Sequence, residues 1–230
     1  TLVTVVPEAI LSVDSGIPAL NGYDSCLIGP GLGKTERSKR IVTDILMHSD
    51  SKYNNGTVKQ GIVVDADAIN ILADFLDDLD IKATEERISY IENELPDDLI
   101  FTPHKKELSR LFAIPMDRLS NLYNLAVMLK NKSSKIFVLK DAATLVVGKG
   151  QMYINTTGNN GMSTAGAGDV PSGIIVSMLA QGLEPFEAAV IGVCIHGHAG
   201  DMARDEYSEY GVMASDISDF AAKYISRIYQ

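Results

Sequence analysis

The chain has 230 residues, of which 46% are hydrophobic and 22% are charged, and 30 acidic against 20 basic residues give a net charge of −10. This balance is typical of a globular protein and argues against disorder and coiled coil. The acidic charge disfavours nucleic-acid binding because it repels the phosphate backbone, although a local glycine loop can still hold the phosphates of a nucleotide.

Strand-like apolar runs alternate with helix-like periodic segments along the chain. We expect strands at 2–6, 24–28, 61–64, 99–102, 135–139, 144–147 and 151–154, the last two joined as a hairpin. We expect helices at 35–47, 68–79, 81–94, 104–112, 119–131, 168–181, 185–204 and 214–229, with a polar turn at 51–57 and a surface location for 81–94. This alternation predicts an α/β fold, a three-layer αβα sandwich around a mostly parallel sheet, in a single domain spanning residues 1–230.

The sequence carries no membrane or secretion signal that we recognise. No stretch reaches the ~18 apolar residues of a membrane span, and the first 17 residues contain no Lys or Arg for a signal peptide. Cys26 and Cys194 each lie in an apolar run, which indicates buried thiols in a reducing compartment. We therefore expect a cytoplasmic protein with no membrane partner. Because Thr1 lies inside a strand-like run and is not Met, we also expect that an upstream segment is missing.

Ligands of such sheets bind at the carboxyl ends of the strands, so the loops that follow strands matter most. The first of these loops runs from Gly29 to Lys34 and is rich in glycine. It is not a P-loop, because Ile28 stands where that pattern needs a glycine. Gly31 and Gly33 would let the backbone approach a ligand closely, and the alternative is a tight strand-to-helix turn.

The loop from Thr156 to Asp169 leads into a long apolar helix and contains no basic residue. Its small residues, Gly166 and Gly168 among them, would leave the first N–H groups of the helix bare, and these form an anion site. Asp169 lies at the mouth of that site. It is either an N-cap or a general base that takes a proton from a hydroxyl beside a phosphate, and we favour the base because a cap alone does not explain a carboxylate there.

Two further loops follow predicted strands. Asp65, Asp67 and Asn70 could position a substrate, or Mg²⁺ through water. The simpler interpretation, favoured when the segment is taken alone, is that Asp67 caps the next helix and Asn70 tethers the loop. His104, after Thr102 and Pro103, could contact a ligand or be a polar residue at a helix start.

A lysine at the end of a buried strand needs a partner. Lys140 has two candidates, a bound phosphate or its neighbour Asp141. Lys105 and Lys106 are expected to lie in solvent. His196 and Asp201 could suggest a metal site. Two metal ligands on one face of a helix are four residues apart, however, and His196 and His198 are only two apart and point away from each other. We expect the helical segment 188–199 to be a core or interface helix.

Taken together, the motifs resemble the ADP/ATP-dependent NAD(P)H-hydrate dehydratases of the ribokinase-like superfamily, often labelled carbohydrate kinases. The resemblance runs from residue 2 to about residue 222. Its most specific parts are Asp65-Ala-Asp-Ala-Ile-Asn70 and Thr102-Pro-His104, together with Gly29-Pro-Gly-Leu-Gly33, Lys140 to Thr144 and Gly158 to Asp169.

The resemblance implies a reaction and a set of site residues. Asp169 would deprotonate the ring hydroxyl of a hydrated nicotinamide dinucleotide, the terminal phosphate of ADP or ATP would accept the oxygen, and loss of phosphate would restore NADH or NADPH. Mg²⁺ would lie on the nucleotide phosphates, with no protein ligand assigned to it, and the enzyme would be a homo-oligomer. We expect Gly31, Gly33, Asp65, Asn70, His104 and Asp169 to bind the hydrate, and Lys140, Asp141, Ala142, Ala143, Thr144, Gly166 and Gly168 to bind the nucleotide.

Three departures from the family pattern leave alternatives open. Asp141 replaces a glycine, Pro171 replaces a leucine, and the family's first strand, glycine-rich loop and helix have no counterpart upstream of residue 2. The first alternative is a small-alcohol kinase of the same superfamily, acting on a thiazole or a sugar. The second is a nucleotide-binding module without catalysis, which Asp141 and the missing segment would favour.

Overall fold

The computed structural model describes residue 20 and residues 22–47 and 60–228, and its centre is a six-stranded sheet. The strands lie side by side in chain order: β1 (Cys26–Ile28), β2 (Ile62–Val64), β3 (Leu99–Phe101), β4 (Ile136–Leu139), β5 (Leu145–Gly148) and β6 (Gln151–Ile154). β1 to β4 are parallel, and β5 and β6 form the expected antiparallel hairpin. The strands expected at 2–6 and the turn at 51–57 lie outside the described residues.

The central strands are buried on both faces, and their side chains alternate between two cores. Val63, Ile100 and Val138 point into one core, whereas Val64, Phe101 and Phe137 point into the other. In the second core the rings of Phe101 and Phe137 stack with centroids 5.0 Å apart.

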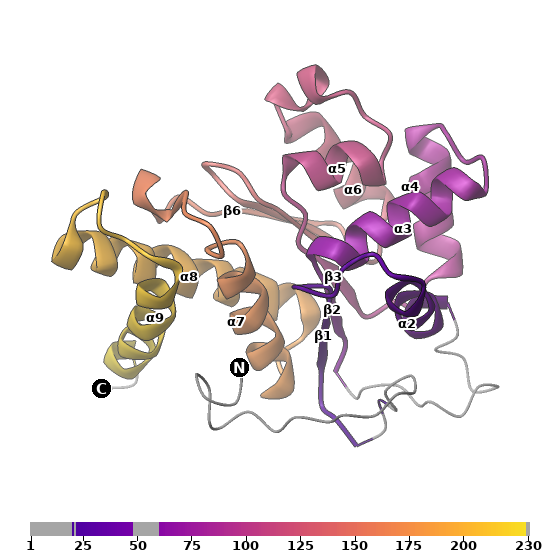
Figure 1. Cartoon of the computed structure of the whole chain (residues 1–230). Helices are drawn as coiled ribbons and strands as arrows, with labels where there is room; N and C mark the ends of the chain where they lie inside the picture. The colour runs from indigo at the N-terminus through magenta and orange to yellow at the C-terminus, as the bar shows by residue number, and fades with distance from the viewer. Residues whose placement is uncertain (1–19, 21, 48–59, 229–230) are drawn as a thin grey trace.

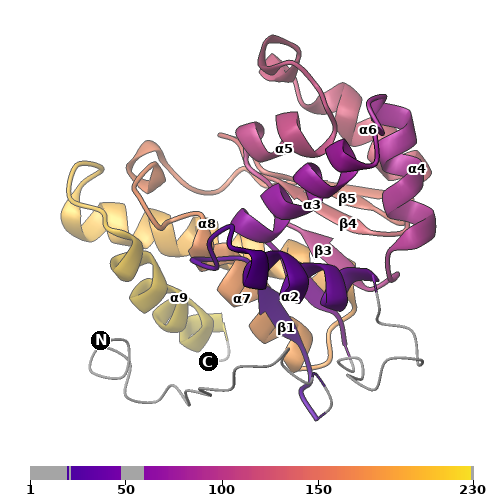
Figure 2. The same cartoon turned by 45° about the vertical axis from the view of Figure 1, so that its right-hand side comes forward.

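Helices cover both faces of this sheet, as Figures 1 and 2 show. One face carries α2 (Glu36–Met47), α3 (Ala66–Asp78), α4 (Thr84–Glu94), α5 (Lys105–Leu111) and α6 (Tyr123–Lys132). The other carries α7 (Asp169–Ala180), α8 (Pro185–Tyr207) and α9 (Ala214–Ile228). Two short 3₁₀ segments are η1 (Met116–Ser120) and η2 (Asn160–Met162). The predicted three-layer α/β sandwich with a mostly parallel sheet is therefore confirmed, whereas the single-domain boundary stays a prediction.

Two helices differ from the expectation. The segment expected as one helix at 119–131 is divided, because η1 ends at Ser120 before α6 begins. α4 is not only a surface helix, since it buries Arg87, Ile88 and Ile91. The Arg87 guanidinium donates to the carbonyl oxygens of Ile81 and Arg110 and pairs with Asp77, which satisfies its buried charge.

α8 is a core helix, in agreement with the first of the two expectations for segment 188–199, a core or an interface helix. It buries Ala188, Gly192, Val193 and Ile195 among others and packs against α7 and α9. Gly192 permits this approach, because a Cβ there would lie 2.4 Å from Ile175 Cγ1. None of the described helices is long and apolar enough to cross a membrane.

The two cysteines are free and half-buried, so the expectation of fully buried thiols is only partly right. Burial raises the pKa of the Cys26 thiol to about 11. The Cys194 sulfur lies 2.8 Å from the Tyr153 hydroxyl oxygen.

Candidate active site

Three neighbouring parallel strands deliver polar residues to one edge of the sheet. Asp65 follows β2, Thr102 and His104 follow β3, and Lys140 follows β4. His104 and Lys140 pair as an isolated parallel bridge, and the Lys140 N–H donates to Pro103 O at 3.0 Å. Because β2, β3 and β4 are neighbours and parallel, their carboxyl ends bring together Asp65 and Lys140, which are 75 positions apart in the sequence.

Asp65 is the centre of this group. Its carboxylate accepts hydrogen bonds from Ala66 N at 2.8 Å, from Lys140 Nζ at 2.9 Å and from Ser172 Oγ at 2.5 Å, and the residue is only 1% exposed. Asp65 is also the N-cap of α3, so the expectation that Asp67 caps this helix is wrong. Because both carboxylate oxygens already accept donors, Asp65 is poorly placed to ligate Mg²⁺ or to bind the hydrate directly.

Lys140 does not pair with its chain neighbour Asp141. It pairs with Asp65, and its Nζ also lies 3.3 Å from Gly168 O at the start of α7. Asp141 instead pairs with Lys105 at 2.8 Å, so Lys105 is not simply solvated. The lysine is thus fixed between the end of β2 and the start of α7.

Thr102, part of the Thr102-Pro-His104 motif, and Ser172, which was not singled out in the sequence, complete the group. The single Ser172 hydroxyl proton goes to Asp65, so Ser172 Oγ accepts from Thr102 Oγ1 at 3.1 Å. Both residues are fully buried. Ser172 lies three residues after Asp169 on the same helix, and this spacing was the signal that could have identified it.

Asp169 is the first residue of α7, and its side chain is exposed. The N-cap is Gly168, which has no capping side chain, so Asp169 does not cap the helix. The Asp169 N–H donates to Gly166 O at 3.1 Å, but its side chain has no hydrogen-bond or ion-pair partner within the described part of the chain. Partial burial raises its pKa, the nearby Asp65 charge adds to this, and Lys140 opposes it. Such a carboxylate is free to accept a proton.

The glycine loop after β1 is held against this edge. Gly29 has φ +123°, and a Cβ there would lie 1.8 Å from Asp65 O, so this position requires glycine for fold reasons. Gly31 and Gly33 also have positive φ, but no described atom lies within 4 Å of a Cβ at either position. Gly33 N donates to Asp67 Oδ2 at 2.8 Å, which fixes the loop. Open space beside Gly31 and Gly33 is compatible with a ligand, and their contact with the hydrate stays a prediction.

Asn70 has a structural role in addition to any ligand contact. Its amide nitrogen donates to Ala66 O at 3.0 Å, and its oxygen accepts from Arg110 Nη1 at 2.5 Å. Asn70 was expected to tether a loop, whereas these hydrogen bonds instead tie α3 to α5.

His104 is the N-cap of α5, in a capping box with Glu107. Its Nδ1 accepts from Lys106 N at 3.1 Å and from Glu107 N at 3.2 Å, so the ring proton lies on Nε2. Burial and the Lys140 charge lower the pKa of His104, and burial raises that of Glu107 to about 6. About half of the His104 side chain is exposed, so a neutral imidazole faces the open side of the site.

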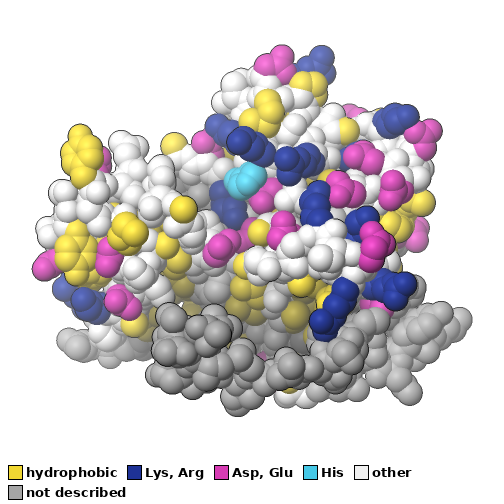
Figure 3. All heavy atoms as spheres, in the orientation of Figure 1, with side chains coloured by type: hydrophobic (Ala, Val, Ile, Leu, Met, Phe, Trp, Pro, Cys, Tyr) yellow, Lys and Arg dark blue, Asp and Glu magenta, His cyan; other side chains and the backbone are white. Residues whose placement is uncertain are grey.

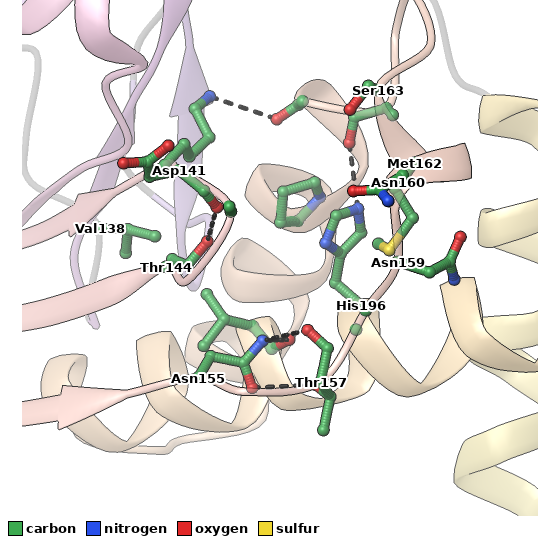
Figure 4. A pocket seen from close by; sticks show the side chains of 18 residues that line it. Val138, Asp141, Thr144, Asn155, Thr157, Asn159, Asn160, Met162, Ser163 and His196 are labelled. Atoms are coloured by element: carbon green, nitrogen blue, oxygen red, sulfur yellow. Dashed lines mark hydrogen bonds between the residues drawn. The ribbon is translucent and has the colours of Figure 1, made fainter. Parts of the chain in front are cut away.

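A cavity of about 440 Å³ lies beside this group. Figure 4 shows Asp141 and Thr144 on one side of it, and Met162, Ser163 and His196 on the other. The predicted nucleotide residues Lys140, Asp141, Ala142, Thr144 and Gly168 line it, but Ala143 and Gly166 do not. The loop from Thr156 to Asp169 was predicted to form an anion site, but most of the residues on this side of the cavity were not named as nucleotide ligands. They are Asn155, Thr157, Gly158, Asn159, Asn160, Met162, Ser163 and, from α8, His196.

His196 is a cavity residue as well as a core residue. Its Nε2–H donates to Ala167 O at 3.1 Å, since the carbonyl can only accept. Burial lowers its pKa to about 4, so the ring is neutral and Nδ1 is left as an acceptor. His198 instead stacks on Tyr224 at 4.6 Å. No group of three or more His, Cys, Asp or Glu in the described ranges could hold a metal.

Asp201 fixes the glycine-rich wall of the cavity. Its carboxylate accepts from Gly158 N at 3.0 Å and from Asn159 Nδ2 at 3.1 Å, and it pairs with Arg204. The face shown in Figure 3 carries acidic and basic side chains interspersed and no broad field of one sign.

Comparison with known proteins gives matches over nearly the whole chain. The profile of the NAD(P)H-hydrate dehydratase family matches residues 2–223. An ADP-dependent (S)-NAD(P)H-hydrate dehydratase from Neisseria meningitidis serogroup B is 32% identical, with 96% of this chain and 70% of that protein covered. A bifunctional NAD(P)H-hydrate repair enzyme from Moorella thermoacetica is 35% identical over 93% of this chain, but the chain spans only 37% of that enzyme.

Solved structures share the fold. A ribokinase-like superfamily protein from Enterococcus faecalis V583 is 28% identical, with a TM-score of 0.68, over 89% of this chain and 63% of that one. An ADP/ATP-dependent NAD(P)H-hydrate dehydratase from Bacillus subtilis, co-crystallised with ATP and Mg²⁺, has a TM-score of 0.73 and 24% identity over 98% and 74% of the two chains. The expected ribokinase-like fold is confirmed.

Proposed function

The chain belongs to the NAD(P)H-hydrate dehydratase family, and from this premise we propose that it dehydrates NADH hydrate or NADPH hydrate at the expense of ADP or ATP. The observation that carries the proposal is Asp169, a carboxylate without a partner among the described residues, at the uncapped start of α7. It lies next to the cavity-lining residues Gly168 and Lys140. A base, an anion site and a nucleotide-sized cavity thus share one sheet edge.

The cavity supports the nucleotide part of the proposal. Its volume of about 440 Å³ lies within the usual range for small-molecule sites, roughly 300–1,000 Å³. The Asp169 N–H already donates to Gly166 O and Pro171 has no N–H, so the positive end of the α7 dipole and the Lys140 ammonium are what favour a phosphate near Gly168. Neutral His196 offers an acceptor to a nucleotide donor group. Ala143 and Gly166 do not line the cavity, which therefore lends no support to their predicted contact with the nucleotide.

The chain's residues then account for the proton and the phosphoryl group. Asp169 takes the proton of the ring hydroxyl, and the hydroxyl oxygen forms a bond to the terminal phosphorus as the bond to the leaving AMP or ADP breaks. The lone pair of the ring nitrogen next drives out phosphate, which leaves with the electrons of the carbon–oxygen bond. Loss of a ring proton then restores the reduced nicotinamide. Lys140 and the positive end of the α7 dipole stabilise the charge that develops on the transferred phosphoryl group.

Mg²⁺ fits the same site when it arrives on the nucleotide. This ion keeps several waters and binds substrate phosphates more often than protein cages. The Thr144 hydroxyl and the Asn155 amide in the wall of the cavity can receive its hydration shell. When bound, Mg²⁺ would neutralise phosphate charge. A homo-oligomeric state and a cytoplasmic location remain part of the proposal.

One incubation tests the proposal. Protein, Mg²⁺ and ADP or ATP are mixed with NADH hydrate, and the absorbance of the reduced ring is followed. Regeneration of NADH that depends on nucleotide supports the dehydratase. A phosphorylated thiazole alcohol or sugar, without NADH regeneration, would instead identify a small-alcohol kinase. Nucleotide binding without turnover of any substrate would identify a binding module.

A further inference from the structure

The buried Asp65 carboxylate and the Lys140 ammonium form a fixed charge pair beside the start of α7. The pair is 2.9 Å long, and the two side chains are 1% and 17% exposed. Ser172, from the first turn of α7, donates to the other Asp65 oxygen at 2.5 Å. Lys140 Nζ contacts Gly168 O, one residue before Asp169. Asp65 and Lys140, which follow two different strands, are thus hydrogen-bonded to the start of the helix that carries the proposed base.

Asp169 is influenced by both members of this pair, in opposite directions. The negative charge of Asp65 disfavours ionisation of Asp169, whereas the positive charge of Lys140 favours it. If Asp65 were neutral, Lys140 would act on Asp169 unopposed. Asp169 would then hold its negative charge more firmly and would be a weaker proton acceptor.

We propose that Asp65 is a positioning residue, which fixes Lys140 against the start of α7 and offsets its charge so that Asp169 remains an effective base. The sequence placed Asp65 among the hydrate ligands. Its three hydrogen-bond donors and near-complete burial fit a role through Lys140 and Asp169 better than contact with substrate. This inference rests on the proposed function only in treating Asp169 as the general base. The electrostatic effect of Asp65 and Lys140 on Asp169 can be measured without turnover.

Other titratable groups around the site do not carry this coupling. His104 and His196 have lowered pKa values and are neutral near pH 7. Glu107 is engaged in the α5 capping box. Asp141 pairs with Lys105. The charged groups that act on Asp169 in the described part of the chain are Asp65 and Lys140.

The test compares three variants: Asp65→Asn, Lys140→Gln and, as a matched control, Asp67→Asn. Asp67 lies in the same turn as Asp65, but its carboxylate accepts from Gly33 N and is not among the groups that act on Asp169. Two readouts are taken. One is the acid limb of kcat/KM against pH for NADH regeneration, and the other is the titration of the Asp169 carboxyl carbon by NMR.

We expect Asp65→Asn to move both readouts to lower pH by roughly one unit, the lower end of what one neighbouring charge does. Lys140→Gln should move them to higher pH, and Asp67→Asn should leave them in place. Opposite directions cannot arise from a merely structural role. Shifts of Asp65→Asn and Lys140→Gln in the same direction, or none in either, would overturn the inference.

The second readout separates this inference from the proposed function. If the wild-type protein does not regenerate NADH but the Asp169 titration shifts in the two opposite directions, the function fails and the coupling stands. If NADH is regenerated and the titration does not respond to either variant, the coupling fails and the function stands. Should Asp65→Asn not fold, the Lys140→Gln titration decides alone, because a downward shift or none contradicts the inference.

Discussion

Gly197 joins α8 to the cavity wall and gives the sharpest test of how that wall is built. In Gly197→Ala, the new Cβ would lie 2.0 Å from Thr157 Oγ1 and 2.9 Å from the Thr157 carbonyl carbon, against an ordinary contact of at least 3.4 Å. The hydroxyl would have to retreat by about 1.4 Å, and the backbone by about 0.5 Å. The Thr157 hydroxyl would also lose its hydrogen bond to Asn155 Oδ1, which is 2.9 Å long.

The cost of this change can be bounded. Overpacking of this kind costs about 1–3 kcal/mol, and replacing a helical glycine by alanine returns at most about 1 kcal/mol. We therefore expect a net loss of about 1 kcal/mol, which lowers Tm by about 2–4 °C in a chain of this size. Because Asn155, Thr157 and Gly197 all line the cavity, ADP affinity should fall as well.

Gly173→Ala is the matched control for stability. Gly173 is also helical, in α7, but no described atom lies within 4 Å of a Cβ there. This variant should gain stability, by up to about 1 kcal/mol. The assay is thermal unfolding of both variants and the wild type, with ADP titrated calorimetrically into wild type and Gly197→Ala. If Gly197→Ala unfolds at or above the wild-type temperature, or binds ADP as the wild type does, the close packing of α8 on this loop is wrong.

Three further predictions follow from single side chains. Because burial raises the pKa of Glu107 from 4.5 to about 6, the folded state binds protons more tightly than the unfolded state, so stability should fall as pH rises between these values. Glu107→Gln should remove this fall. Urea unfolding at several pH values between 4.5 and 6 measures the free energy of unfolding, and the same dependence on pH in the variant and the wild type would contradict the prediction. Asp141→Gly breaks the half-buried pair with Lys105 and should change the free energy of unfolding by less than about 1 kcal/mol. The variant should bind ADP more tightly, because it removes a carboxylate from the cavity. Weaker ADP binding in calorimetry would refute this prediction. Cys26, with a thiol pKa raised to about 11, should be alkylated by iodoacetamide far more slowly than free cysteine near pH 8, as mass spectrometry can show, and equal rates would mean that the thiol is not desolvated.

The order of the elements could be predicted because the period of apolar residues reports local structure directly. Continuous runs such as Ile136–Leu139 predict strands buried on both faces, and the structure has β4 there. The glycines between Val147 and Gln151 predict the hairpin. Boundaries were less secure: the break between η1 and α6 falls at Asn121, whose side-chain oxygen accepts from Tyr123 N, and this local turn was not recognised in the sequence.

Pairing within the site was harder to predict, because it depends on which strands are neighbours. Lys140 and Asp65 are 75 residues apart and meet only because β2, β3 and β4 lie side by side. The sequence suggested Asp141 as the partner of Lys140 because adjacency in the chain was the only proximity available. His196 was assigned to the core for a similar reason, since a small-residue helix gives no sign that one of its turns faces a cavity.

The most direct test of the account is the comparison of Asp169→Asn with the wild type in NADH-hydrate dehydration and in ADP binding. The substitution keeps the size of an exposed side chain that has no partner among the described residues, so the fold and the cavity should be unchanged. A lost general base costs about 10²–10⁴-fold in rate, so turnover should fall at least that far while ADP affinity stays within a few-fold. Turnover near the wild-type rate in a protein that still binds ADP would contradict the assignment of Asp169 as the base.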